Sequence, residues 1–179
     1  QAAGLSVSRL FSSQPKERIV QAWWSQCFPP NLMALEAKLG YELGYRLYKV
    51  KARPFEDPFE QAAAIQSATG MDMKVWADAN GTIGTVDQAL AFGEGIGKFP
   101  QYAGIESPCQ GAKVEDYRAL KGLFPLPLAE HIPSDPMPFI REELLGALVV
   151  GGPIGKSLVQ RALMAEVTGV PIWLQHSIF

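Results

Sequence analysis

Ionisable side chains recur in this sequence at the ends of short apolar runs that are typical of β-strands. These residues are, in chain order, Lys49, Lys51, Asp78, Asn80, Glu106, Glu130, His131 and His176. A single acidic strand end is explained by a turn, because Asp, Asn and Gly are residues that turns prefer. The same pattern at one strand end after another indicates a shared site instead.

The residue types suit proton abstraction assisted by a metal ion. Because side chains alternate along a strand, Lys49 and Lys51 lie on the same side. A second positive charge nearby favours the neutral amine that a base requires. Asp78, Glu106 and Glu130 carry the carboxylate oxygens that Mg²⁺ prefers. Such an ion stabilises the negative charge formed when a base removes a proton next to a substrate carboxylate.

The elements that must position these residues alternate along the whole chain. The predicted strands cover residues 19–28, 45–52, 73–79, 102–107, 127–132, 147–152 and 171–176. The predicted helices cover residues 31–44, 57–68, 85–99, 113–124, 137–146 and 155–169. This alternation favours an α/β fold with a parallel sheet, either open and doubly wound or closed into a barrel. In both architectures the functional groups lie at the carboxyl ends of the strands.

The composition argues against several other classes of protein. Lys and Arg number 16 against 18 Asp and Glu, so there is no excess of positive charge for binding nucleic acid. No apolar run approaches the roughly 20 residues that cross a bilayer. Cys27 and Cys109 fit no metal-binding spacing and are interpreted as reduced thiols of a cytoplasmic protein.

Taken together, the motifs resemble the barrel domain of the enolase superfamily, specifically its mandelate racemase and muconate-lactonising enzyme branch. The resemblance rests on "YKVKARP", "DANGTIGTVDQAL", "GIESP" and "LPLAEH", which occur in the family's order and at similar intervals. It implies a truncated (β/α) TIM-type barrel with about seven visible strands and no capping domain. "GLSVSRLF" is similar to the segment that leads from that capping domain into the barrel. Residues 1–18 are therefore expected to be a linker remnant, and residues 19–179 a partial barrel.

The resemblance also implies roles for individual residues. Lys51 matches the catalytic lysine, and Lys49 matches its partner. Asp78 and Glu106 match the first two ligands of a Mg²⁺ ion. His176 matches the histidine that some members use at the seventh strand.

The remaining positions are less uniquely matched. The third metal ligand falls on Glu130 or, counted from Pro127, on His131, and Asn80 accompanies Asp78 as a metal or substrate contact. The sixth strand departs from the family pattern, because residues 149–152 include neither the Asp nor the Lys that is usual there.

The implied reaction is the Mg²⁺-assisted removal of a proton α to a carboxylate, as in acid-sugar dehydratases, racemases and cycloisomerases. The implied partners are a small carboxylate substrate, such as a sugar acid, and further copies of the full-length chain in a homo-oligomer. Two alternatives stay open. One is a non-catalytic barrel that retains the metal site. The other is a phosphate-binding protein that uses the turn Gly155-Lys156-Ser157, although Val150 stands where a P-loop has its first glycine.

Overall fold

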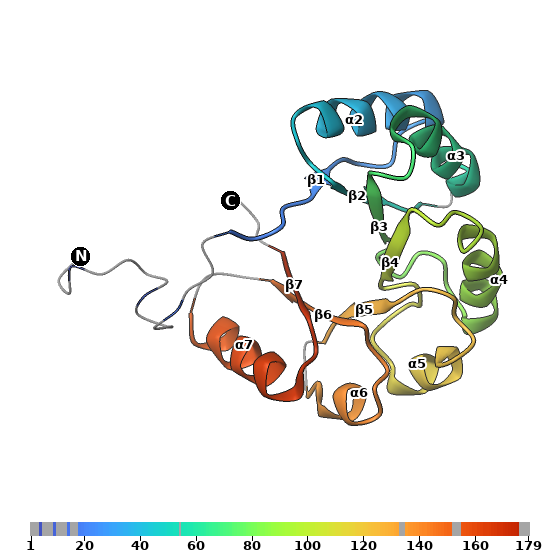
Figure 1. Cartoon of the computed structure of the whole chain (residues 1–179). Coiled ribbons are helices and arrows are strands. Elements are labelled where there is room, and N and C mark those ends of the chain that lie inside the picture. Colours follow the sequence, from blue (N-terminus) through green and yellow to red (C-terminus); the bar gives the residue numbers. More distant parts are fainter. Residues whose placement is uncertain are drawn as a thin grey trace.

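Seven parallel strands form one curved sheet, and the helices lie along its outer side (Figure 1). The computed structural model describes residues 18–53, 55–132, 135–151 and 155–175, together with positions 4, 9 and 14. Neighbouring strands in the sequence are also neighbours in the sheet, in the order β1 to β7. The fold is therefore of the TIM-barrel type, which is one of the two architectures that the alternating pattern allows and the one that the motif resemblance implies.

The boundaries follow the predicted elements, except that the first strand and the helices predicted over 113–124 and 137–146 are shorter. The strands are β1 (Trp23–Trp24), β2 (Leu47–Lys51), β3 (Lys74–Asp78), β4 (Tyr102–Glu106), β5 (Leu128–His131), β6 (Ala147–Gly151) and β7 (Ile172–Gln175). The helices are α2 (Pro30–Glu42), α3 (Pro58–Thr69), α4 (Val86–Ile96), α5 (Val114–Leu120), α6 (Met137–Arg141) and α7 (Lys156–Thr168). None of the described helices has both the length and the apolar character needed to cross a bilayer.

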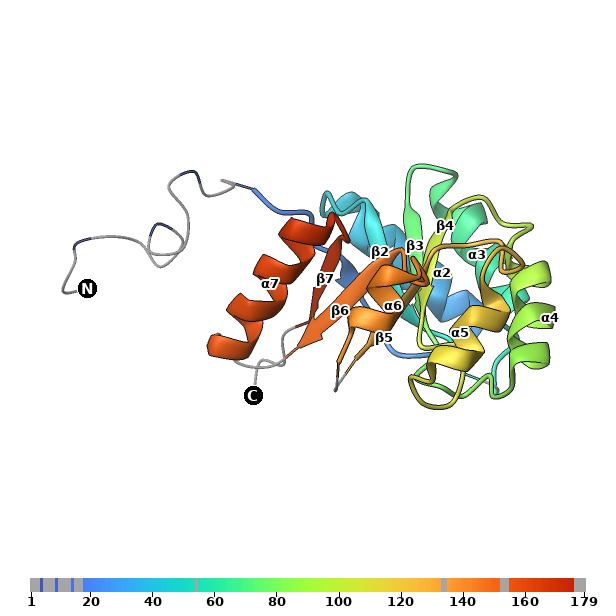
Figure 2. The same ribbon diagram turned by 90° about the horizontal axis from the view of Figure 1, so that it is seen from below.

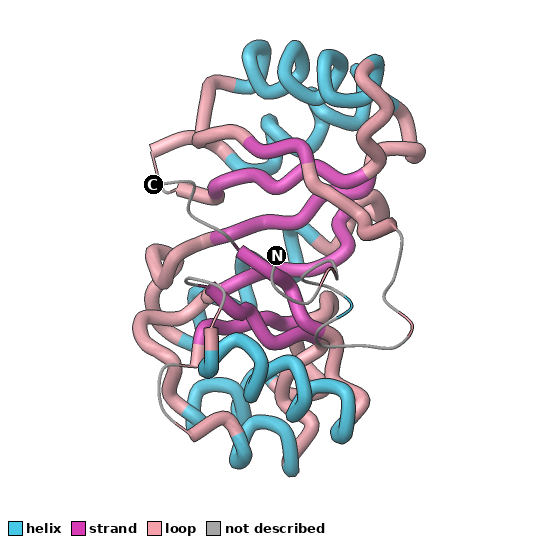
Figure 3. Tube along the Cα trace, turned by 90° about the vertical axis from the view of Figure 1, so that its left-hand side faces the viewer, coloured by secondary structure: helices cyan, strands magenta, loops and turns pink. Residues whose placement is uncertain are grey.

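The curled sheet has two edges. Within the described residues β1 pairs only with β2, and β7 pairs only with β6. Figure 2 shows α5, α6 and α7 in front of the strands, and Figure 3 shows the strands between helices above and below them. The described strands thus form part of a barrel wall with its inner face turned away from the helices.

The first strand is much shorter than predicted. Residues 19–28 have the composition of a strand, but only Trp23 and Trp24 pair with β2. The two rings point to opposite sides, as alternation requires. The Trp23 Nε1–H donates to Glu36 on α2 over 3.0 Å, whereas Trp24 is 50% exposed. The ladder with β2 includes only these two residues, and Pro30 already begins α2.

Alternation divides the apolar side chains between an outer core and a smaller inner cluster. The outer core lies between sheet and helices and includes Tyr48, Val75 and Leu148, all with no exposed surface. In the inner cluster the ring of Trp76 on β3 stacks on that of Trp173 on β7, with centroids 4.9 Å apart. This stack joins two strands that are far apart in the sheet.

Gly104 provides the room that the Trp76 ring needs. A Cβ atom at this position would lie 2.6 Å from Trp76, because the two residues pair across β3 and β4. We therefore expect Gly104→Ala to lower the free energy of unfolding by about 1–3 kcal/mol, measured by urea denaturation. The double variant Gly104→Ala/Trp76→Phe should lose less than the sum of its single changes, because the smaller ring leaves space. Unchanged stability of Gly104→Ala would contradict this packing.

Candidate active site

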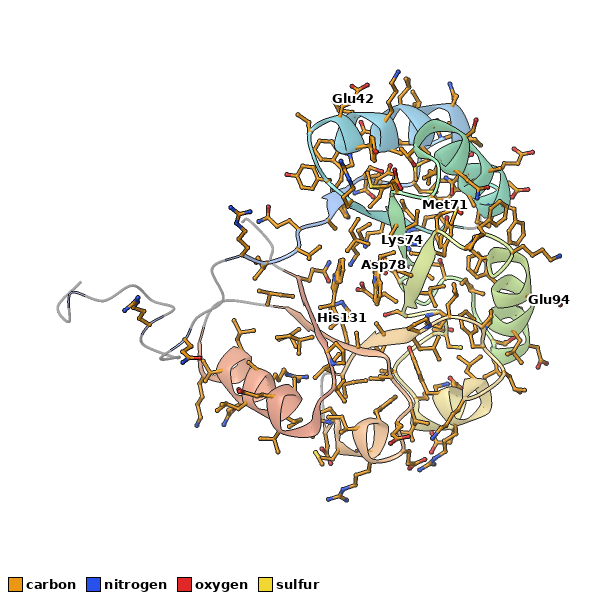
Figure 4. All side chains as sticks on the ribbon, in the orientation of Figure 1. Glu42, Met71, Lys74, Asp78, Glu94 and His131 are labelled. Carbon is orange, nitrogen blue, oxygen red and sulfur yellow. The ribbon has the colours of Figure 1, made fainter. Side chains whose placement is uncertain are left out.

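A row of charged side chains crosses the inner face of the sheet at the carboxyl ends of three strands. Lys51 on β2 pairs with Asp78 on β3, and Asp78 pairs with Glu106 on β4. Lys49 lies on the same face, two residues before Lys51. The view in Figure 4 shows Asp78 on the inner side of the sheet, whereas Glu94 lies on the outer helix α4. The structure thus brings four of the predicted residues together.

The two lysines balance the charges of the two carboxylates. Lys49 Nζ lies 2.6 Å from Glu106 Oε2 and 3.3 Å from Asp78 Oδ2. Lys51 Nζ lies 2.5 Å from the same Asp78 oxygen. Both carboxylates are fully buried. Because like charges on facing residues of adjacent strands repel, and because burial of each charge is costly, the lysine contacts are needed to offset both effects.

The turn after β3 adds Asn80 to this cluster. Its side-chain oxygen accepts hydrogen bonds from Lys51 Nζ, over 2.9 Å, and from the Arg53 guanidinium. Its backbone N–H donates to Asp78 Oδ1 over 3.0 Å. Asn80 has a φ of +49°, a left-handed conformation that Asn adopts more readily than most residues. The turn therefore directs the amide back toward the lysine.

Arg53 was not predicted as a site residue. Its guanidinium reaches Asn80 and also donates to the backbone oxygen of Ala79 over 2.9 Å. The signal was present in the sequence, since Arg53 follows Lys51 by two residues and so continues the spacing of Lys49 and Lys51.

His131 contacts the cluster from β5. Its Nε2 lies 2.8 Å from Glu106 Oε1, and 41% of its side chain is exposed. The hydrogen bond to Glu106 raises the pKa of His131 and outweighs the effect of burial, which lowers it. For Glu106, burial acts to raise the pKa, but the hydrogen bond from His131 and the charge of Lys49 together lower it. Each of the two side chains thus stabilises the charged form of the other.

Glu130 lies on the other face of β5. It pairs with Leu148 of the outer core, whereas the neighbouring Ala129 pairs with Glu106 in the inner row. The position of β5 that is level with the two inner carboxylates is therefore an alanine. His131 reaches Glu106 from one step further along the strand.

The donor set fits a Mg²⁺ ion in part. Such an ion is commonly held by one or two carboxylates, with water and substrate oxygens completing its octahedron. Asp78 and Glu106 supply two carboxylates side by side. Within the described residues, however, no group of three or more His, Cys, Asp or Glu side chains lies ready to hold a metal ion. The third ligand stays a prediction.

A cavity of about 280 Å³ lies beside the cluster, in the loops that follow β3 and β4. Its lining includes Asn80, Ser107, Glu130 and His131. A larger cavity of about 650 Å³ lies against α4 and contains none of the predicted site residues. We regard the smaller one as the relevant space, because residues from three strand ends border it.

Two sequence predictions fall wholly or partly outside the described residues. His176 lies beyond residue 175, where the description ends. For the phosphate-binding turn, Gly155 precedes α7 and Lys156 is its exposed first residue. Residues 152–154, which precede that turn, and the Ser157 side chain lie outside the description, so both predictions stay untested.

Comparisons with known proteins support the fold. No family model and no curated protein sequence matches the chain. Among solved structures, N-succinyl Arg/Lys racemase from Bacillus cereus matches with a TM-score of 0.85 and 20% identity, covering 97% of this chain and 49% of that one. A mandelate racemase/muconate lactonizing family protein from Azoarcus sp. matches with a TM-score of 0.82 and 24% identity, covering 97% of this chain and 48% of that one. Dipeptide epimerase from Enterococcus faecalis matches with a TM-score of 0.77 and 17% identity, covering 89% of this chain and 48% of that one.

These likenesses establish the architecture. The chain has the barrel fold of mandelate racemase/muconate lactonizing enzymes and other enolase superfamily members. The resemblance inferred from the motifs is therefore confirmed at the level of the fold. The chain spans about half the length of the solved structures that it matches.

The contact between His131 and Glu106 should make stability depend on pH. Because folding raises the pKa of His131, its contribution is fully present below the ordinary value of 6.5 and is lost as the pH rises through the raised value. Glu106, with its lowered pKa, stays ionised throughout that range. We expect the stability difference between the unaltered protein and His131→Gln to shrink from about pH 5.5 to about pH 9 in metal-free urea titrations. A difference that is constant or grows would contradict the contact.

Proposed function

We propose that this chain is the catalytic barrel of a Mg²⁺-dependent enzyme of the enolase superfamily that removes a proton α to a substrate carboxylate. The observation that carries the proposal is the cluster of Lys49, Lys51, Asp78 and Glu106 at the carboxyl ends of barrel strands. Charged groups are rarely buried unless they are paired, and a buried cluster of ionisable groups at the end of a barrel is a candidate functional site.

Asp78 and Glu106 would hold the Mg²⁺ ion. When bound, the ion supplies positive charge to the substrate carboxylate and to the negative charge that develops as the proton leaves. Their oxygens lie at the end of the sheet from which substrates enter barrels of this type. For the third ligand, Glu130 has the oxygen chemistry that Mg²⁺ prefers, whereas His131 is the residue that contacts Glu106.

Lys51 would accept the α proton at Nζ. It lies closer to the end of β2 than Lys49 and is more accessible, with 11% of its side chain exposed against 5%. In this structure Lys51 Nζ donates to Asp78 and Asn80, so it would accept the α proton only after these contacts are released and another positive charge lies beside the Asp78 carboxylate. Lys49 already lies 3.3 Å from the same oxygen and would stay with the carboxylates while Lys51 exchanges its proton.

The fate of the resulting intermediate depends on a group on the far side of the substrate. The names of the solved neighbours include racemase, epimerase and cycloisomerase, which favours an isomerase; loss of water, as in a dehydratase, stays within the proposal. His176 is the candidate for the second acid or base. The substrate would be a small carboxylate, such as a sugar acid.

The wider setting belongs to the same proposal. Residues 1–18 would be a linker remnant and 19–179 the partial barrel, in a cytoplasmic enzyme that forms homo-oligomers at full length and binds neither nucleic acid nor membrane. A second candidate is a non-catalytic barrel that retains the metal site. It is favoured by the end of β6, where Val149, Val150 and Gly151 provide no acid or base.

The decisive experiment is proton exchange in D₂O. The protein is incubated with Mg²⁺ and a panel of sugar acids and N-acyl amino acids, and loss of the α-proton signal is followed by NMR. Lys51→Met should slow the exchange by at least ~10²–10⁴-fold, because a positioned base is lost.

Lys74→Met is the matched control. Lys74 lies on the same face of β3 as Asp78 but at the opposite end of the strand, so its replacement should leave the exchange rate unchanged. Exchange at the unaltered rate in Lys51→Met would exclude Lys51 as the base. Absence of exchange by the unaltered protein with the whole panel would favour the non-catalytic barrel.

A further inference from the structure

Glu130 is a buried carboxylate whose two oxygens are both occupied by hydrogen-bond donors. Only 4% of the residue is exposed. Oε1 accepts hydrogen bonds from Ser107 Oγ, over 2.5 Å, and from the backbone N–H of His131, over 2.7 Å. Oε2 accepts one from the Tyr117 hydroxyl over 2.5 Å. These donors compensate for the loss of water around the carboxylate.

Tyr117 ties this carboxylate to the helix layer. It lies on α5 with no exposed surface, and its ring contacts Phe139 on α6 edge to face, with centroids 5.4 Å apart. Burial, and to a lesser degree the charge of Glu130, raises the pKa of Tyr117. The hydroxyl therefore stays protonated and is the hydrogen-bond donor to Glu130. The carboxylate is thus anchored on the side of β5 that faces away from the inner row.

Ser107 is held in an unusual backbone conformation. It directly follows Glu106 and has a φ of +49°, a left-handed conformation that is uncommon for residues other than glycine. Its backbone N–H donates to Ala129 on β5 over 3.0 Å, and its hydroxyl donates to Glu130. Both contacts fix the end of β4 against β5.

The two residues that Glu130 holds both border on Glu106. Ser107 is its neighbour in the chain, and the His131 ring contacts its Oε1. Glu130 therefore influences the position of Glu106 through its hydrogen bonds to Ser107 and His131, although its own side chain does not face the inner row. A change at Glu130 would therefore be transmitted to Glu106 through Ser107 and His131.

We propose that Glu130 is a positioning residue: its carboxylate holds the ends of β4 and β5 so that Glu106 and His131 face each other, and it is not a ligand of the metal ion. The inference rests on the proposed function, in which Glu106 holds that ion. It assigns the third-ligand position to His131 or to water and substrate, and it gives Tyr117 and Ser107 a part in the geometry of the site.

The first test uses metal-free protein and follows hydrogen exchange of the His131 backbone amide by NMR. Glu130→Gln and Tyr117→Phe should each reduce its protection by about tenfold, the effect of losing one hydrogen bond. Tyr48→Phe is the matched control, because Tyr48 is equally buried and its hydroxyl bonds Ser25 over 2.6 Å, away from β5. It should leave the exchange of His131 unchanged. Unchanged protection in Tyr117→Phe would overturn the proposal.

The second test measures Mn²⁺ affinity by electron paramagnetic resonance, with Asp78→Asn as the variant that should lose binding. Glu130→Gln and Tyr117→Phe should both weaken binding by about 10–100-fold, as changes around ligands usually do, with no change in the number of waters on the bound ion.

If Glu130 were a ligand, Glu130→Gln would add a water to the ion and Tyr117→Phe would leave the affinity unaltered; this pair of results would overturn the proposal. Absence of Mn²⁺ binding by the unaltered protein would instead refute the proposed function, and the exchange of the His131 amide would still decide whether Glu130 holds the strand ends.

Discussion

The burial of Asp78 directly opposite Glu106 is the constraint on which the rest of the site depends. Two carboxylates without solvent on adjacent strands repel each other and lose their hydration. Lys49 lies within 3.3 Å of both and Lys51 within 2.5 Å of Asp78, so each carboxylate has a cation. This balance requires β2, β3 and β4 to be in register, which the curved parallel sheet provides. The proposed catalytic residues thus depend on the sheet geometry, because the register of these three strands brings the four charged side chains together.

The fold and the central cluster follow from patterns that are local in the sequence. Alternating strand and helix patterns predict a parallel sheet, and the spacing of Lys49 and Lys51 predicts that both side chains face the same side. Capping adds further detail, since Thr85 precedes α4 and exchanges hydrogen bonds with Gln88 in a capping box. These features depend on neighbours along the chain, which explains why they are visible without a structure.

The features that could not be predicted depend on contacts between distant segments. Glu130 and His131 are adjacent in the chain, and composition does not say which of them faces the inner row. The answer depends on the pairing of Ala129 with Glu106 and on Tyr117, which reaches Glu130 from α5. Arg53 joins the site only because the turn at Asn80 returns toward β2.

The central claim is that the buried charges serve chemistry and do not stabilise the fold. The most direct measurement is the free energy of unfolding of the double variant Lys51→Met/Asp78→Leu, which removes the ion pairs of Asp78 with both lysines and leaves Lys49 paired with Glu106. Apolar replacements of buried ion pairs are often neutral or stabilising by about 1–4 kcal/mol. We expect the variant to be as stable as the unaltered protein or more stable, in urea titrations without metal. A loss of several kcal/mol would show that the cluster is a structural ion pair and would contradict the account.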